Sequence, residues 1–137
     1  MLEFEGLNLF AIVVAWLIAC GVGAYWYSAA GFGKLWAKLS GVNHLEIPEK
    51  EATAALISIV LSTVIQVAAL AVVLNSLHAT EIVDGLMVGL VLWAGFVAAT
   101  TVGNTLYQRL GWRFWWLNAS YFLLVMVVNS VLLTLWK

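Results

Sequence analysis

Residues 7–28 read LNLFAIVVAWLIACGVGAYWYS and contain no charged side chain. A helix needs about 20 mainly apolar residues to cross the hydrocarbon core of a bilayer, so this stretch predicts a transmembrane helix. Three further stretches, residues 52–76, 82–107 and 114–136, have similar length and character, and Asp84 is their only charge. The sequence therefore predicts an all-α fold, a polytopic membrane four-helix bundle, with one transmembrane domain over residues 1–137.

The composition of the whole chain supports this prediction. Hydrophobic residues make up 64% of the 137 residues and charged residues only 9%, whereas soluble domains carry about 25% charged residues. Thirteen charges are too few to cover the surface of a soluble domain of this size. We therefore expect the lipid bilayer to be the main partner. The net charge of -1 gives no reason to expect nucleic acid binding.

The basic residues are distributed unevenly between the two predicted sides. Five lie in the loops after the first and third spans: Lys34, Lys38, Lys50, Arg109 and Arg113. Lys137 is the only one on the other side. Because cytoplasmic loops are enriched in Lys and Arg, both loops are predicted to be cytoplasmic and both termini to lie outside. His44 and His78 would then lie on opposite sides, too far apart to share a metal within one protomer.

Residues 30–42 are predicted to form a short interfacial helix after the first span. The apolar residues of this stretch recur at helical spacing: Phe32, Leu35, Trp36 and Leu39. Lys34 and Lys38 lie off that face, as in helices that rest on a membrane surface, and Gly41 is a suitable stop. These lysines, with Arg109 and Arg113, are candidates for binding lipid headgroups. Positive-inside anchoring explains the same four residues.

Acidic residues and one proline mark the predicted starts of two spans. Pro48 suits the first turn of the second span. Glu49 and Glu51 follow it, where the helix dipole favours negative charge. In the third span, Thr80 is the predicted N-cap, and the acids after it have the same explanation.

An internal repeat appears when the sequence is shifted by eighty positions. Eight pairs match: Ala15 with Gly95, Ala19 with Ala99, Val22 with Val102, Gly23 with Gly103, Tyr27 with Tyr107, Gly31 with Gly111, Phe32 with Trp112, and Trp36 with Trp116. The pattern predicts a duplicated helical hairpin in which the small faces of spans one and three meet at the bundle centre. A second small pair, Gly85 and Gly89, is predicted to contact another subunit.

Uncharged polar residues form stripes on spans two, three and four. The candidate members are Ser62, Gln66, Thr101, Asn104, Tyr121 and Asn129. They could line a path for a small neutral solute, or they could join neighbouring helices by hydrogen bonds. Trp16 and Trp93 lie near mid-span, where each indole N–H needs an acceptor, so both are predicted to be helix-packing residues.

The spans lack the residues that catalysis or ion coupling requires. No ionisable side chain lies deep in any span, whereas coupled transporters usually carry one there. The sequence contains no nucleophile–base pair, metal-ligand cluster or phosphate-binding loop. We therefore expect no enzymatic activity, no catalytic residue, no metal and no cofactor.

Two blocks of sequence resemble a known family. Residues 23–28 read GAYWYS and residues 31–36 read GFGKLW; further along come Gly95-Phe96, Asn104 and the stretch NASY at 118–121. Together they resemble DUF1761, a family of uncharacterised bacterial membrane proteins. The chain departs from that pattern at Ala29 and at residues 111–113, where proline and an Arg-Pro pair are common. The resemblance implies a membrane architecture and no reaction.

The leading hypothesis is a non-enzymatic bacterial inner-membrane protein that acts as a homo-oligomer or as a small subunit of a larger membrane complex. Small-residue faces and an uncharged interior motivate it. A channel or facilitator for a small neutral solute and a lipid-interacting protein at the cytoplasmic interface are the alternatives.

Overall fold

The computed structural model describes residues 1–42 and 46–136, and every regular element within these ranges is helical. The predictions on His44 and Lys137 lie outside the described residues. The elements follow in the order α1 (Leu9–Trp26), α2 (Gly33–Ser40), α3 (Glu49–Ser76), α4 (Ile82–Leu92), the π-helical turn η2 (Trp93–Ala98), α5 (Ala99–Tyr107) and α6 (Gly111–Leu135). The elements α4, η2 and α5 together form one continuous helix.

Four of these helices are long and apolar enough to cross a membrane. They are Leu9–Trp26, Glu49–Ser76, Ile82–Tyr107 and Gly111–Leu135, with mean hydropathies of 2.1, 2.5, 2.1 and 1.8. The predicted all-α fold with four apolar spans is therefore confirmed, and the chain has the build of a multi-pass membrane protein. The short helix α2 follows the first span, within the predicted stretch.

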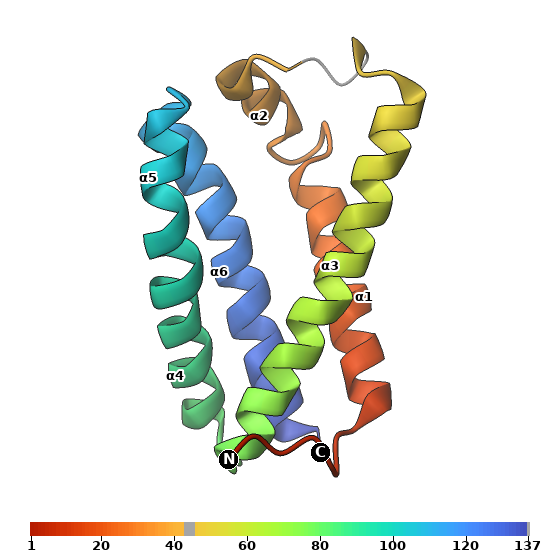
Figure 1. Cartoon of the computed structure of the whole chain (residues 1–137), viewed down its shortest axis with the longest axis vertical. Helices are drawn as coiled ribbons and strands as arrows, with labels where there is room; N and C mark the ends of the chain where they lie inside the picture. Colours follow the sequence, from red (N-terminus) through yellow and green to blue (C-terminus); the bar gives the residue numbers. More distant parts are fainter. Residues whose placement is uncertain (43–45, 137) are drawn as a thin grey trace.

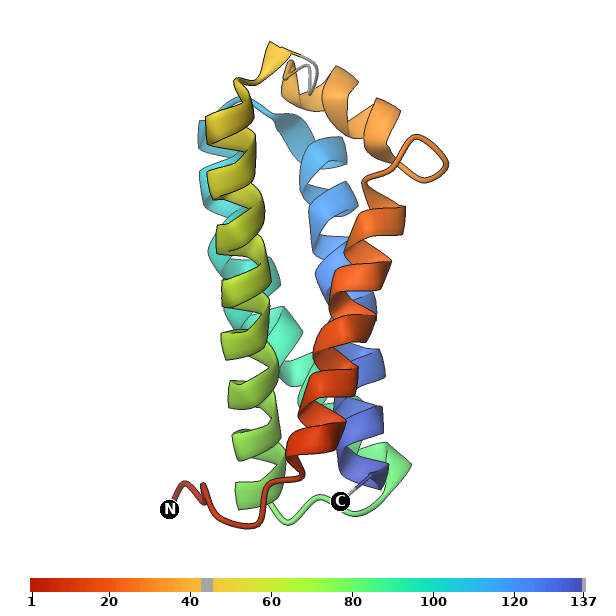
Figure 2. The same cartoon turned by 90° about the vertical axis from the view of Figure 1, so that its right-hand side faces the viewer.

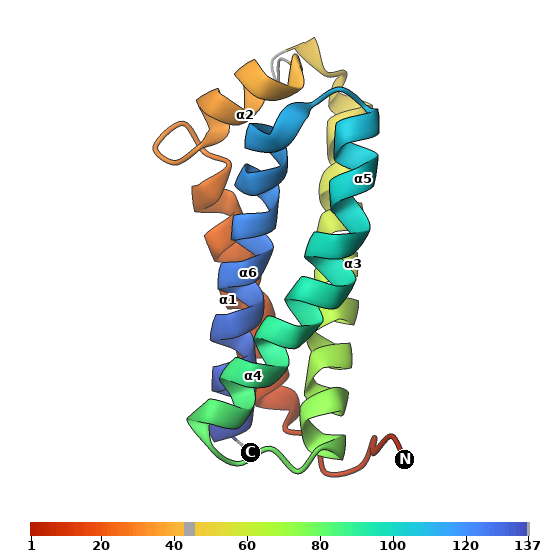
Figure 3. The ribbon, with the colours of Figure 1, turned by 90° about the vertical axis from the view of Figure 1, so that its left-hand side faces the viewer.

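The helix α6 lies at the centre of the bundle (Figures 1 and 3). In the most apolar 18-residue stretch of α6, 50% of the residues are buried inside the protein. The corresponding share is 11% for Ile82–Tyr107 and 17% for α1. The helices α1 and α4 pack on α6 from different sides, and α3 packs on α1 and α6. Both termini lie at one end of the bundle, and α2 lies across the other (Figure 1).

The largest apolar cluster lies toward the terminal end of the bundle. It joins residues of α1, α3 and α6, including Ala11, Ala15, Val67, Leu74 and Leu133. Higher on α1, the helices α1 and α3 separate toward α2 (Figure 2). The upper half of α3 is exposed throughout residues 49–59.

The helix ends explain where the chain turns. Gly41 follows α2 with a φ of 73°, a left-handed conformation that glycine adopts without strain, so the predicted stop is confirmed. Pro48 is the N-cap of α3, one residue before the helix begins. The predicted N-cap Thr80 is wrong: Glu81 takes that position. The Asp84 carboxylate accepts hydrogen bonds from the backbone N–H groups of residues 80 and 81, completing a capping box with Glu81.

The π-helical turn changes which side of the third span faces α6. Gly85 and Gly89 are buried below the turn, and Ala98 is buried at its end. The step from Trp93 to Ala98 is five residues, as a π turn requires, and both lie in one cluster with α6. In a regular α-helix, the face of Gly85 and Gly89 would have continued through Phe96 and Thr100, and both are exposed here.

Candidate functional site

Aromatic and polar side chains gather where the upper part of α1 meets α6. The Tyr27 hydroxyl donates to Asn118 Oδ1 at 2.7 Å, and the Trp26 indole N–H donates to the Leu117 carbonyl at 3.2 Å. The Tyr121 hydroxyl donates to the Ala19 carbonyl at 3.0 Å, across the same interface. These three side chains therefore satisfy their hydrogen-bonding groups between helices, as a membrane-spanning bundle favours.

Small residues of α1 allow this approach to α6. Ala15 and Ala19 are fully buried. A methyl group added at Gly23 would lie 2.8 Å from the Tyr121 hydroxyl and 3.3 Å from Cζ of its ring. Only glycine leaves room for the tyrosine here, so the predicted small face of α1 packs on α6 at Ala19 and Gly23.

Two further glycines position α2 over this cluster. A methyl group at Gly31 or Gly33 would collide with backbone carbonyls at the end of α1. The tight turn brings the Phe32 ring to 4.7 Å from the Trp26 ring, and Trp36 of α2 lies 6.3 Å from Phe114 of α6, between ring centroids. Residues 23–36 and 118–121, which carry part of the family resemblance, thus form one contact region. Gly95, Phe96 and Asn104, which carry the rest, are exposed on the third span.

The small residues of the third span divide into two groups. Gly85 and Gly89 are buried against α6. Methyl groups added to them would lie 2.9 Å from Thr134 Oγ1 and 2.9 Å from Ser130 Oγ, respectively. The prediction that this pair contacts another subunit is therefore wrong, because one face of α6 already occupies it.

Gly95, Ala99 and Gly103 form the second group, and all three are exposed. An added methyl group at Gly95 or Gly103 would meet no atom within 4 Å. The predicted meeting of these residues with the small face of α1 is wrong, because the π turn directs them outward. The repeat also fails at its tyrosines, since Tyr27 is hydrogen-bonded to α6 whereas Tyr107 is 95% exposed.

The six candidate residues of a polar path do not share one cavity. Ser62 is exposed and donates to the Ile59 carbonyl within its own helix. Thr101 accepts from the Trp115 indole at 3.1 Å, and Tyr121 bonds α1 as described. Gln66 is half-buried and Asn104 is exposed on another helix. None of the six lines the cavity beside Asn8 and Trp136 or the hollow beside Lys50 and Ile57, so this arrangement does not favour a solute path through one chain.

Asn129, the sixth of these residues, is buried on α6. It is 1% exposed, and its neighbour Ser130 is fully buried. Among residues 1–42 and 46–136, neither the Asn129 Oδ1 atom nor the Ser130 Oγ atom has a hydrogen-bond partner. The mid-span indoles are better satisfied: Trp16 donates to the Val60 carbonyl at 3.2 Å and Trp93 to the Ala119 carbonyl at 2.8 Å. Their predicted packing role is confirmed.

The candidate headgroup residues lie at the end of the bundle that carries α2. Lys34 and Lys38 are exposed on α2, and Arg109 and Arg113 are exposed around the turn between α5 and α6. Arg109 has a φ of 61°, which marks the tightness of this turn. Within the ranges that the structure describes, no three His, Cys, Asp or Glu side chains gather as a metal site would need.

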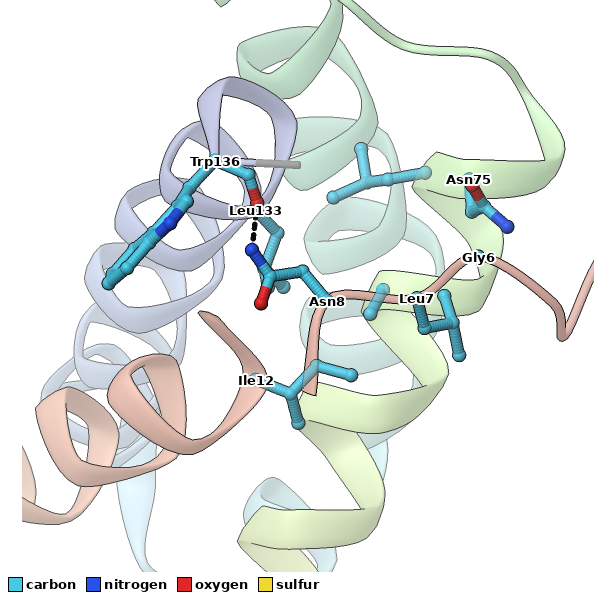
Figure 4. Close-up of a pocket in the computed structure, with 9 residues that line it drawn as sticks. Gly6, Leu7, Asn8, Ile12, Asn75, Leu133 and Trp136 are labelled. Carbon is cyan, nitrogen blue, oxygen red and sulfur yellow. Dashed lines mark hydrogen bonds between the residues drawn. The ribbon is translucent and has the colours of Figure 1, made fainter. Parts of the chain in front are cut away.

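A strap at the N-terminus (residues 1–8) was not predicted from the sequence. Asn75 at the end of α3 donates to the backbone carbonyls of Glu3 and Glu5 at 3.1 and 2.9 Å, and the Glu3 N–H donates to the Ser76 hydroxyl. Asn8 donates weakly to the Trp136 carbonyl at 3.5 Å (Figure 4). The strap borders a cavity of about 30 Å³, which has room for a water molecule.

The comparisons with known proteins agree with this architecture. A family model described as "Protein of unknown function (DUF1761)" matches residues 10–134. No curated protein and no solved structure matches the chain. Since the family model spans nearly the whole chain, the chain belongs to the DUF1761 family, and the resemblance of its two sequence blocks is confirmed.

Proposed function

We propose that this DUF1761 protein is a non-enzymatic protein of the bacterial inner membrane that acts by helix packing, as a homo-oligomer or as a small subunit of a larger membrane complex. The observation that carries the proposal is the outward small face of the third span, formed by Gly95, Ala99 and Gly103 and exposed along its length.

The physical argument concerns how helices associate in lipid. Because lipid tails are as apolar as leucine, association depends on close packing and on hydrogen bonds between helices. Small residues at every fourth position let a second backbone approach closely. The Asn104 side chain follows this face directly and is exposed, so it is available to bond across an interface. Within the chain, the other small faces already pack on α6.

The orientation belongs to the same proposal. All five basic residues of the loops lie toward the end that carries α2, and both described chain ends lie at the opposite end. Positive-inside anchoring supports an orientation with α2 at the cytoplasmic interface and both termini outside.

Disulfide cross-linking in native membranes tests the proposed interface. In a Cys20→Ala background, the Ala99→Cys variant should form a cross-linked dimer or trap a partner upon mild oxidation. The matched control is Ala69→Cys, which places a thiol on an exposed position of α3. Equal cross-linking at both positions, or none at Ala99 in any membrane preparation, would refute the proposed face.

A second candidate function is lipid interaction at the cytoplasmic surface. The amphipathic α2 lies across the end of the bundle with Lys34 and Lys38 exposed, and such helices bind anionic membranes. Arg109 and Arg113 lie toward the same end. Vesicles containing anionic lipid should slow the amide hydrogen exchange of α2 more than neutral vesicles do. Equal exchange rates in both kinds of vesicle would count against this function.

A further inference from the structure

One face of α3 is buried at its lower end and exposed at its upper end. Its members recur at alternating steps of three and four residues: Ala71, Val67, Val64, Val60, Ile57, Thr53 and Lys50. Such spacing places them on one side of a helix. Ala71 is 6% and Val67 1% exposed, Val64 and Val60 are half-buried, and Ile57 is 55% exposed. A face that forms the core below therefore loses its partner above.

The loss begins where α1 and α3 separate. The Trp16 indole donates to the Val60 carbonyl at 3.2 Å, and above this bond the two helices diverge toward α2 (Figure 2). An open hollow of about 450 Å³ lies along the upper turns of α3, and its lining residues all belong to that helix: Glu49, Lys50, Thr53, Ala54 and Ile57. We call the space above the Trp16–Val60 bond the α1–α3 wedge.

We infer that the α1–α3 wedge holds a phospholipid with a zwitterionic headgroup. The lining of the hollow changes polarity along the helix, from a carboxylate and an ammonium in the first turn to a hydroxyl in the second and to alkyl groups beyond. The groups of a phospholipid follow the same order. Lys50 complements the phosphate and Glu49 complements the ammonium group. Deeper in the membrane, Thr53 complements the ester oxygens and Ile57 contacts the acyl chain. Both charged side chains are exposed and available.

The depth of the wedge supports a lipid. From Lys50 to Val60 is about 15 Å at 1.5 Å per residue, which is about half of the roughly 30 Å hydrocarbon core and hence one leaflet. A helix of a second copy fits less well, because packed helices keep an interaxial distance of about 8–10 Å. The wedge narrows to a direct contact at Val60, where an acyl chain can taper and a helix cannot. The inference does not depend on self-association through the small face of the third span.

Photolabelling of the full chain in proteoliposomes tests the inference. The probe is a phosphatidylethanolamine with a diazirine on its acyl chain, and labelled positions are mapped by mass spectrometry. Adducts should concentrate on the wedge face between residues 53 and 64. Unlabelled phosphatidylethanolamine should compete better than phosphatidylcholine, whose quaternary ammonium cannot donate a hydrogen bond to Glu49, and better than phosphatidylglycerol, which has no ammonium.

Matched variants distinguish a specific site from the general lipid shell. Ile57→Trp should fill the wedge and lower the labelling several-fold. Ile59→Trp should not: Ile59 is equally exposed, at 57%, but lies two residues on and so on the other side of α3. The Lys50→Gln variant, whose substitution lies at the polar upper end of the same face, should lower the preference for the probe by about two- to five-fold, as for an exposed ion pair.

Three outcomes would overturn the inference. Uniform labelling around α3 would mean general lipid contact only. Equal effects of the Ile57 and Ile59 substitutions would mean that the wedge is not the site. A cross-linked dimer formed through a cysteine at residue 57, in the Cys20→Ala background, would mean that a second copy fills the wedge.

Discussion

Substitution of Gly23 by valine is predicted to destabilise the bundle much more than the same change at Gly21. A methyl group at Gly23 would already lie 2.8 Å from the Tyr121 hydroxyl, whereas one at Gly21 would meet nothing within 4 Å. Overpacking costs about 1–3 kcal/mol, and loss of the Tyr121–Ala19 hydrogen bond adds about 0.6 kcal/mol. We expect the Gly23→Val variant to lose about 2–4 kcal/mol and the Gly21→Val variant about 0.5 kcal/mol or less.

The assay is reversible unfolding of the purified protein in mixed micelles by increasing fractions of sodium dodecyl sulfate, followed by circular dichroism. A second substitution isolates the cause. The Tyr121→Phe variant lacks the hydroxyl that a methyl group at Gly23 would approach most closely, so Gly23→Ala should cost less in that background than in the original protein. Equal losses for the two glycines, or identical costs of Gly23→Ala in both backgrounds, would refute the packing of α1 on α6 derived above.

Three further predictions follow from the same interfaces. The Gly89→Leu variant should lose about 1–3 kcal/mol in the same unfolding assay because its side chain meets α6, whereas Gly95→Leu should change stability by about 0.5 kcal/mol or less; a larger loss at Gly95 would contradict the outward orientation. The Tyr27→Phe variant should lose about 0.6 kcal/mol with the hydrogen bond to Asn118, and no additional loss should appear when Asn118→Ala is combined with it. The Asn75→Leu variant should speed amide hydrogen exchange in the N-terminal strap and leave α6 unchanged, and unchanged exchange of the strap would show that its hydrogen bonds do not hold it.

The four spans were predictable because each is an uncharged run of the length that a bilayer requires. The end of α2 was predictable for a similar reason, since Gly41 adopts a conformation that favours glycine. These features depend on local sequence alone. The match of the family model to residues 10–134 was also expected from the resemblance of residues 23–36, Gly95-Phe96, Asn104 and residues 118–121 to that family.

The pairing of the small faces was not predictable from spacing alone. The repeat assumes a regular α-helix through the third span, but the π turn Trp93–Ala98 shifts the face that follows it. Ala98 is buried where the regular spacing placed Ala99. A π turn has no distinct residue signature, so the shift appears only when the packing against α6 is known.

Long-range hydrogen bonds are the other feature that the sequence did not reveal. Asn75 donates a hydrogen bond to the strap residue Glu5, which lies 70 residues earlier in the sequence. Tyr27 donates a hydrogen bond to Asn118, which lies 91 residues later. Each donor and acceptor looks ordinary in its own segment. The polar stripes show the same limit, since Thr101 and Tyr121 each bond a different helix partner.

The number of copies in the native bilayer tests the proposed packing role most directly. Tagged protein would be extracted with its surrounding lipid in polymer nanodiscs, and the mass of each particle would be measured for the original protein and for an Ala99→Leu variant. The packing role predicts particles that hold several copies or a partner protein, and single copies for the variant. Single copies without a partner for the original protein would contradict it.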